Sequence, residues 1–250
     1  MPGLKRAIAN ALGHVAGVSI VPRSAIALLF EREHLRRFLT EFDIDCVFDV
    51  GANAGQYGQM LRELGFRGSI VSFEPVPALA EELKKNTRRD PLWFVEEAAL
   101  DSVVREASFN VMRSSQFSSL NMPSHSETLL FQEENTIAYS VDVTTALLSH
   151  FFIKHESALG FTRPFLKMDT QGNDLAVARG AGKFLTRFVG LQSELAIKKI
   201  YKATENFHTA IDYYVDQGFE LSAFVPNNLG HFPVLIEVDC IMFNSRFYYK

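Results

Sequence analysis

The sequence has little cysteine, which excludes a disulfide scaffold and a cysteine-rich metal centre. Its two cysteines, Cys46 and Cys240, both fall in apolar stretches that we expect to be strands. Buried free thiols are typical of a reducing compartment. We therefore expect a cytoplasmic protein.

The chain also lacks a long hydrophobic run and an excess of basic residues. The apolar stretch 7–22 is interrupted by Asn10 and His14 and falls short of the ~20 apolar residues of a membrane span. Lys5 and Arg6 precede it, as in a signal peptide, but no A-x-A cleavage pattern follows. A helix that contacts a membrane surface or a partner is the alternative. A net charge of -4 gives no reason to expect nucleic acid as a partner.

What the chain does contain is an apolar fraction of 47% over 250 residues, enough for one α/β domain with a sizeable core. Predicted strands and helices alternate, which favours a doubly wound, mainly parallel sheet with helices on both faces. We expect a helical extension at 1–42 and the main domain at 43–250. A homodimer remains open.

The most informative stretch, 46–56, reads as a strand that ends after Asp49 and turns through Gly51 and Gly55 into a helix. A second strand, 69–73, ends at Glu74 and Pro75. An acid at the tip of the second strand of a β-α-β unit is placed to bind the two hydroxyls of a ribose. This pattern predicts a nucleoside cofactor across the ends of both strands.

The glycine spacing decides which nucleoside we expect. A dinucleotide site has G-x-G-x-x-G, whereas this chain has G-x-x-x-G preceded by Asp49. A carboxylate repels a diphosphate but suits a sulfonium, which favours S-adenosylmethionine. An NAD-dependent oxidoreductase on a related fold, or a plain turn without a ligand, is the alternative.

Two further segments are candidates for the cofactor site. Ala98 and Ala99 follow a third strand, and small side chains there leave a flat slot for adenine, although a plain turn has the same composition. The serine-rich segment 113–135 is predicted to be a long loop. It is either a lid that brings Ser118 and Ser119 near the ligand or a solvated surface loop.

A third acid-tipped strand spans 164–169. Asp169 is expected to project into the cleft that holds Asp49 and Glu74, or else to cap the next helix. Glu194 is expected at the carboxyl end of a strand at 188–194. The turn between the last two strands, 219–225 and 235–243, carries His231, and Thr144 with Thr145 is expected to cap a helix.

Together the motifs F-D-V-G-A-N-A-G-Q-Y at 48–57, F-E-P at 73–75, K-M-D-T-Q-G at 167–172 and Q-S-E-L at 192–195 resemble the FkbM family of S-adenosylmethionine-dependent methyltransferases. The resemblance covers roughly residues 40–245. It implies the class I Rossmann-like fold with seven strands, the last one antiparallel between its neighbours. It also implies methylation of a hydroxyl oxygen on a sugar, glycan or secondary metabolite.

By position, the resemblance assigns the turn around the methionine part to Gly51, Asn53 and Gly55, and the ribose to Glu74. The full set expected to contact the cofactor is Asp49, Gly51, Ala52, Asn53, Gly55, Gln56, Tyr57, Glu74, Pro75, Ala98, Ala99 and Asp169. Many relatives have glutamate where this chain has Gln171. A binding module without turnover is therefore a further alternative.

Methyl transfer needs an aligned acceptor and often a base. Our candidates, in order, are Asp169, His231, Glu194 and His125. A divalent ion bridging Asp169 and Glu194 is conceivable. We expect no metal, because the sequence has no tight acidic cluster.

Overall fold

The computed structural model describes residues 26–226 and 233–249. Three expectations lie outside these residues: the signal-peptide and surface-helix alternatives for the stretch 7–22, and the role of His231. In the part that is described, no helix is long and apolar enough to span a membrane.

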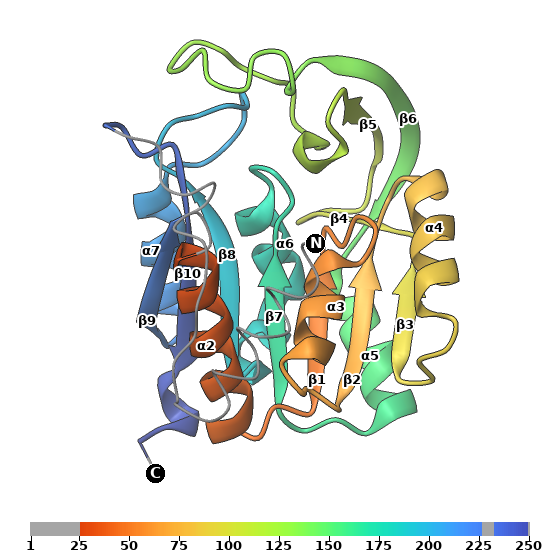
Figure 1. The fold of residues 1–250 in the computed structure, drawn as a ribbon, viewed down its shortest axis with the longest axis vertical. Coiled ribbons are helices and arrows are strands. Elements are labelled where there is room, and N and C mark those ends of the chain that lie inside the picture. The colour runs from red at the N-terminus through yellow and green to blue at the C-terminus, as the bar shows by residue number, and fades with distance from the viewer. Residues whose placement is uncertain (1–25, 227–232, 250) are drawn as a thin grey trace, which may run out of the picture.

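A seven-stranded sheet forms the centre of the molecule (Figure 1), with the strand order β3-β2-β1-β7-β8-β10-β9. Strands β3, β2, β1, β7 and β8 are parallel, and β10 is antiparallel to both of its neighbours. This confirms the expected class I order with the last strand inserted. The strands are β1 Cys46–Val50, β2 Ser69–Phe73, β3 Trp93–Glu96, β7 Pro164–Met168, β8 Gly190–Ala196, β9 Phe219–Pro226 and β10 Glu237–Asn244.

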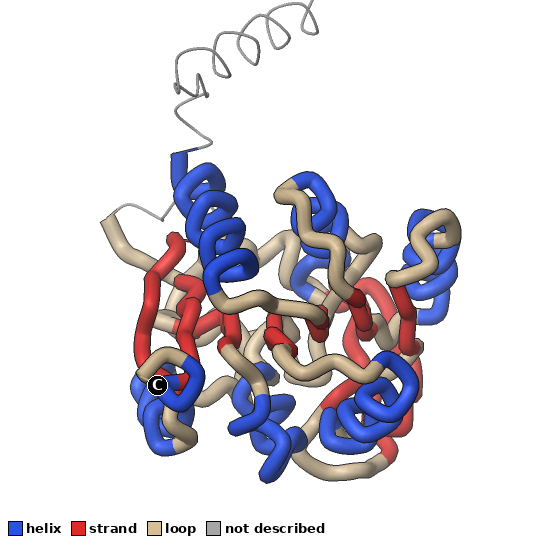
Figure 2. The backbone as a smooth tube through the Cα atoms, turned by 90° about the horizontal axis from the view of Figure 1, so that it is seen from below, coloured by secondary structure: helices blue, strands red, loops and turns tan. Residues whose placement is uncertain are grey.

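Helices cover both faces of the sheet (Figure 2). The helices α2, α3 and α4 lie on one face, and α5, α6 and α7 lie on the other. The bounds are α2 Ile26–Glu41, α3 Gln56–Glu63, α4 Pro77–Thr87, α5 Leu148–Leu159, α6 Asp174–Ala181 and α7 Phe207–Asp216. Because both faces are covered, every residue of β1 and of β7 is buried, as expected for parallel strands.

The helix α2 belongs to the core. Leu35, Phe38 and Leu39 of α2 are buried with Val47 of β1 and Phe165 of β7. The described part of the expected 1–42 extension is therefore packed on the sheet.

A small sheet of the order β4-β6-β5 lies beyond the carboxyl ends of β1 and β2 (Figure 1). Its strands are β4 Ala99–Leu100, β5 Glu106–Met112 and β6 Ile137–Ala146. The segment 113–135 connects β5 to β6 and is more ordered than the expected loop. It contains the 3-10 helix η2 at Ser115–Phe117, and bridges join Asn110 to Ser119 and Pro123 to Tyr201.

Two local expectations were wrong. Thr144 and Thr145 do not cap a helix, because β6 continues to Ala146 and Leu147 precedes α5 without a side-chain cap. Glu194 is not at the end of its strand, because pairing with β10 extends β8 to Ala196. Both strands are longer than expected, because each pairs with a strand that is distant in sequence.

Candidate active site

A cavity of about 510 Å³ opens at the carboxyl ends of β1, β2, β7 and β8. The chain passes from β1 to β2 and β3 on one side and returns to β7 and β8 on the other, so the cavity lies where the strand order reverses. Ligands of open α/β sheets bind at such a point. Its volume is in the range of small-molecule sites.

The turn after β1 forms the floor of this cavity. Gly51 has φ 80°, and a Cβ atom there would lie 1.9 Å from the carbonyl oxygen of Asp169. Only glycine lets this turn approach the β7 loop so closely. Asn53 also has a positive φ, of 49°, and its side-chain oxygen accepts a hydrogen bond from the Ala54 N–H at 2.8 Å.

Glu74 is fixed by this turn at the tip of β2. Its carboxylate accepts hydrogen bonds from the backbone N–H groups of Asn53 at 3.0 Å and Val76 at 2.9 Å. The side chain lines the cavity although the residue is only 5% exposed. Burial raises its pKa to about 7, against the two backbone hydrogen bonds, which lower the pKa. Each oxygen keeps a lone pair that can accept a ligand hydroxyl.

Asp49 does not line the cavity, contrary to the expectation that it faces a cationic ligand. It is fully buried inside β1, where Lys167 Nζ lies 3.2 Å from its Oδ1 and Ser72 donates to its Oδ2 at 3.2 Å. The strand continues to Val50 before the turn, so this carboxylate lies beneath the floor of the site. Lys167 does line the cavity, so it lies between the buried Asp49 carboxylate and the site.

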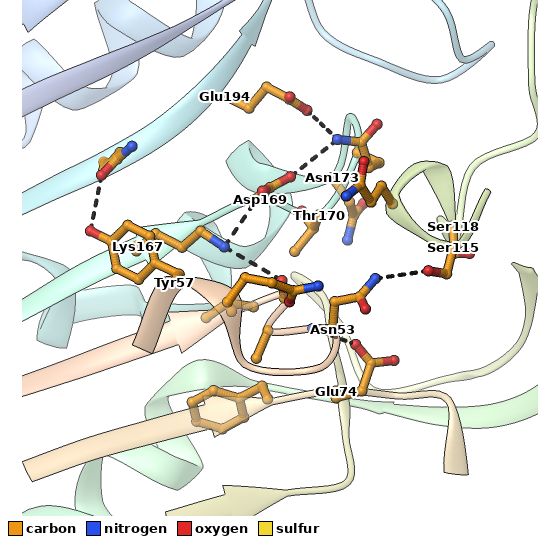
Figure 3. A pocket seen from close by; sticks show the side chains of 18 of the residues that line it. Asn53, Tyr57, Glu74, Ser115, Ser118, Lys167, Asp169, Thr170, Asn173 and Glu194 are labelled. Carbon is orange, nitrogen blue, oxygen red and sulfur yellow. Dashed lines mark hydrogen bonds and ion pairs between the residues drawn. The ribbon is translucent and has the colours of Figure 1, made fainter. Parts of the chain in front are cut away.

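Asp169 occupies the middle of the cavity wall (Figure 3). Lys167 Nζ lies 3.5 Å from one carboxylate oxygen, and Gln171 Nε2 donates to the other at 3.1 Å. The same amide donates to Glu194 at 2.8 Å, and its oxygen accepts from Tyr201 at 2.9 Å. Gln171 thus links the carboxylates of Asp169 and Glu194. This is the position where many relatives have glutamate.

The wall beyond Asp169 is strongly acidic. Gln192 and Glu194 on β8 lie beside Glu237 and Asp239 on β10, and all four line the cavity. Burial, together with the nearby carboxylates of Asp169 and Asp174, raises the pKa of Glu237 to about 8. Burial and Glu237 likewise raise the pKa of Glu194.

Gln192 holds this wall to the helices. It accepts a hydrogen bond from the Tyr57 hydroxyl at 3.0 Å and donates to Glu31 of α2 at 2.9 Å and to Asp239 at 3.1 Å. The residue is 2% exposed, so its amide is a structural element of the site rather than a surface group.

The opposite end of the cavity is more apolar and is covered by the small sheet. Its wall includes Phe73, Ala98, Ala99, Leu100, Phe109 and Phe117. Asn53 Nδ2 donates to Ser115 at 3.2 Å, which ties η2 to the turn after β1 (Figure 3). Ser118 lines this end, whereas Ser119 is fully buried and donates to the Gln171 carbonyl at 2.7 Å.

Most of the residues expected from the sequence meet here. The cavity brings together Gly51, Ala52, Asn53, Gln56, Tyr57, Glu74, Pro75, Ala98, Ala99, Asp169 and Glu194. Gly55 does not line it and instead precedes α3, where a Cβ would lie 2.6 Å from Leu83. His125 is not part of the lining either.

Sequence reasoning missed Lys167, Gln192, Glu237 and Asp239. The sequence feature that could have revealed them is a polar residue with apolar neighbours inside a strand. Lys167, between Leu166 and Met168, is the clearest case. For metals, no group of three His, Cys, Asp or Glu side chains within 26–226 and 233–249 is arranged to hold an ion.

The model of the methyltransferase FkbM domain matches residues 49–221. The chain belongs to the FkbM family of methyltransferases. Its methyl donor is S-adenosylmethionine. A search of curated proteins found no match.

Solved methyltransferases resemble this FkbM-family chain only distantly. Magnesium protoporphyrin IX methyltransferase from Synechocystis PCC 6803 with bound S-adenosylmethionine is 9% identical, with 96% of this chain and 97% of that chain covered and a TM-score of 0.45. Fibrillarin from Aeropyrum pernix, also with S-adenosylmethionine, is 12% identical, with 79% and 66% covered and a TM-score of 0.44. At these TM-scores the likeness supports no conclusion about this chain's chemistry.

The residues of the cavity fit S-adenosylmethionine. Glu74 would offer a fixed carboxylate to the ribose hydroxyls, and the wall at Ala98 and Phe109 is apolar enough for an adenine ring. Tyr57 and Lys167 lie on the side of Asp169, where the amino-acid part would be held. When bound, the cofactor supplies an electrophilic methyl group on a sulfonium.

Proposed function

We propose that this protein methylates a hydroxyl oxygen of a sugar, a glycan or a secondary metabolite. The observation that carries the proposal is the position of Asp169. Its carboxylate is 44% exposed, lines the cavity at the point where the strand order reverses, and is oriented from two sides by Lys167 and Gln171. A fixed, accessible carboxylate is suited to accept the hydrogen bond of an attacking hydroxyl.

In this proposal each polar side chain has one task. Asp169 orients the acceptor hydroxyl and accepts its proton. Lys167 and Gln171 hold Asp169 in one rotamer by contacts of 3.5 Å and 3.1 Å. Glu194 accepts a hydrogen bond from the Gln171 amide at 2.8 Å and so positions Gln171. The small sheet covers the apolar end of the cavity, where the adenine ring would lie, and limits water there.

Transfer of a radiolabelled methyl group from S-adenosylmethionine to a panel of sugars, glycolipids and hydroxylated metabolites tests the proposal. We expect a base-stable, ether-linked product. Asp169→Asn should lower kcat by about 10²–10⁴-fold. His125→Asn, outside the cavity, is the matched control and should leave kcat unchanged. Transfer exclusively to nitrogen or carbon acceptors, or full activity of Asp169→Asn, would contradict the proposal.

A further inference from the structure

The carboxylates at the β8–β10 end of the cavity are not needed for the cofactor. Strands lie about 4.8 Å apart, so β10 is about 19 Å from β2 and Glu74. The amino-acid arm of S-adenosylmethionine is roughly 7 Å long at about 1.5 Å per bond. A cofactor whose ribose is held at Glu74 therefore ends near β1 and β7, and leaves Glu237 and Asp239 to another ligand.

The surroundings of Glu237 indicate what kind of ligand this is. It is 4% exposed and lines the cavity, and no described side chain or backbone group makes a hydrogen bond to its carboxyl. A buried carboxyl without a partner costs free energy, and such groups in native proteins normally meet a ligand or an ion. Its strand neighbour Asp239 and the facing Glu194 surround the same space.

The negative charge of the cavity lining indicates the charge of the ligand. Six acidic side chains of the described residues line the cavity, five of them besides Glu74: Glu31, Asp169, Glu194, Glu237 and Asp239. Two cations of the described residues also line the cavity: Lys167 is shared between Asp49 at 3.2 Å and Asp169 at 3.5 Å, and Arg32 contacts Glu63 at 2.8 Å. An anionic acceptor, such as a phosphorylated or carboxylated sugar, would be repelled.

We infer that the acceptor carries a protonated amine, as in an amino sugar or another amino alcohol, and that Glu237, with Glu194 and Asp239, receives it. An ammonium has three donors and no acceptor, which matches a group of carboxylates. It also has no lone pair, so it cannot take the methyl group itself. The acidic wall would then direct transfer to the hydroxyl beside Asp169. This inference rests on the proposed hydroxyl methylation and names its substrate class.

Binding of a matched pair of sugars tests the inference without turnover. Methyl α-glucosaminide and its N-acetyl derivative share their ring hydroxyls and differ in the ammonium. Each is titrated by calorimetry near neutral pH into the full chain saturated with S-adenosylhomocysteine. We expect the amine to bind at least about tenfold more tightly than the amide.

Variants assign that preference to the acidic wall. Glu237→Gln has nearly the same shape and should reduce the preference to about twofold or less, while the affinity for S-adenosylhomocysteine is kept and reports a folded protein. Glu82→Gln, an exposed carboxyl on α4, is the control and should keep the full preference.

The outcomes separate the two hypotheses. If S-adenosylhomocysteine does not bind, the proposed function fails. If it binds but the amine shows no measurable affinity, binds no better than the amide, or keeps its advantage in Glu237→Gln, the inference alone is overturned.

Discussion

Lys167 Nζ lies 3.2 Å from Asp49 Oδ1 between two adjacent parallel strands, and both residues are buried. Burial lowers the pKa of Lys167, but Asp49 and Asp169 outweigh it, so the net shift is upward and the amine stays charged. The pair connects the interior of the sheet to the floor of the cavity, because the same Nζ lies 3.5 Å from Asp169.

Replacing Lys167 by methionine should therefore destabilise the fold. It leaves Asp49 buried without a counter-charge, a loss of about 3–5 kcal/mol for a broken buried pair. The double variant with Asp49→Asn should recover much of that loss, because no unpaired charge remains. Urea unfolding of the single and double variants measures both. A double variant as unstable as Lys167→Met would show that packing, not charge, explains the loss. Lys84→Met, on the surface of α4, is the control.

Gly51→Ala should disrupt the floor of the site. The added Cβ would lie 1.9 Å from the Asp169 carbonyl oxygen, at a φ of 80° that alanine rarely adopts. We expect a loss of roughly 2 kcal/mol or more in unfolding free energy and weaker S-adenosylmethionine binding. Gly65→Ala shares the positive φ, of 92°, but meets no atom within 4 Å. It should cost only about 1 kcal/mol and leave the affinity unchanged. Equal effects at both positions would refute the close-contact explanation.

Glu74→Ala should weaken S-adenosylmethionine binding by at least about tenfold, because it removes two charge-assisted hydrogen bonds to the ribose. Adenosine binding should weaken by the same factor, since the lost contacts involve the ribose alone. Calorimetry with both ligands measures this. Glu97→Ala is the control, because Glu97 lies nearby but outside the cavity and pairs with Lys84 at 3.3 Å. An unchanged adenosine affinity in Glu74→Ala would place the ribose elsewhere.

The stability of the ligand-free protein should fall as pH rises from about 4.5 to about 8. Glu237 has its pKa raised from 4.5 to about 8 by burial and by the charges of Asp169 and Asp174. Between these values the folded state binds more protons than the unfolded state, so each increase in pH favours unfolding. Glu194 and Asp239, on the facing and the same strand, shift in the same direction.

Glu237→Gln removes one of these groups, so its stability should depend less steeply on pH over that window, by a few kcal/mol at the most. Denaturant unfolding at a series of pH values measures the two slopes. Identical slopes in wild type and variant would show that Glu237 does not titrate upward. Glu82→Gln should reproduce the wild-type slope, since Glu82 is exposed.

The residues of the site that stand at the ends of strands could be predicted from the sequence. Gly51, Glu74 and Asp169 stand at strand ends in the sequence, and the carboxyl ends of parallel strands meet at one edge, so their convergence followed from the strand pattern. Asp49 looked equivalent in the sequence. Its burial depends on where β1 ends and on a lysine from β7, which is far away in the chain.

The remaining wall could not be predicted from the sequence. Glu237 and Asp239 read as ordinary residues of a late strand until the antiparallel insertion of β10 beside β8 brings Asp239 opposite Glu194. The small sheet likewise pairs β4 with β6 across a long separation and brings Ser115 to Asn53. Register between distant strands is set by packing of the whole core, which no short window of sequence contains.

The sequence by itself determined the alternation of strands and helices, the glycine turn and the acids at the strand tips, because each depends on residues within one turn or one strand of its neighbours. Tertiary structure alone decided which acids share a cavity, which one is neutralised by Lys167, and which one has no hydrogen-bond partner among the residues that the structure describes. Burial and long-range charge set those outcomes, and both exist only once the sheet has closed around its core.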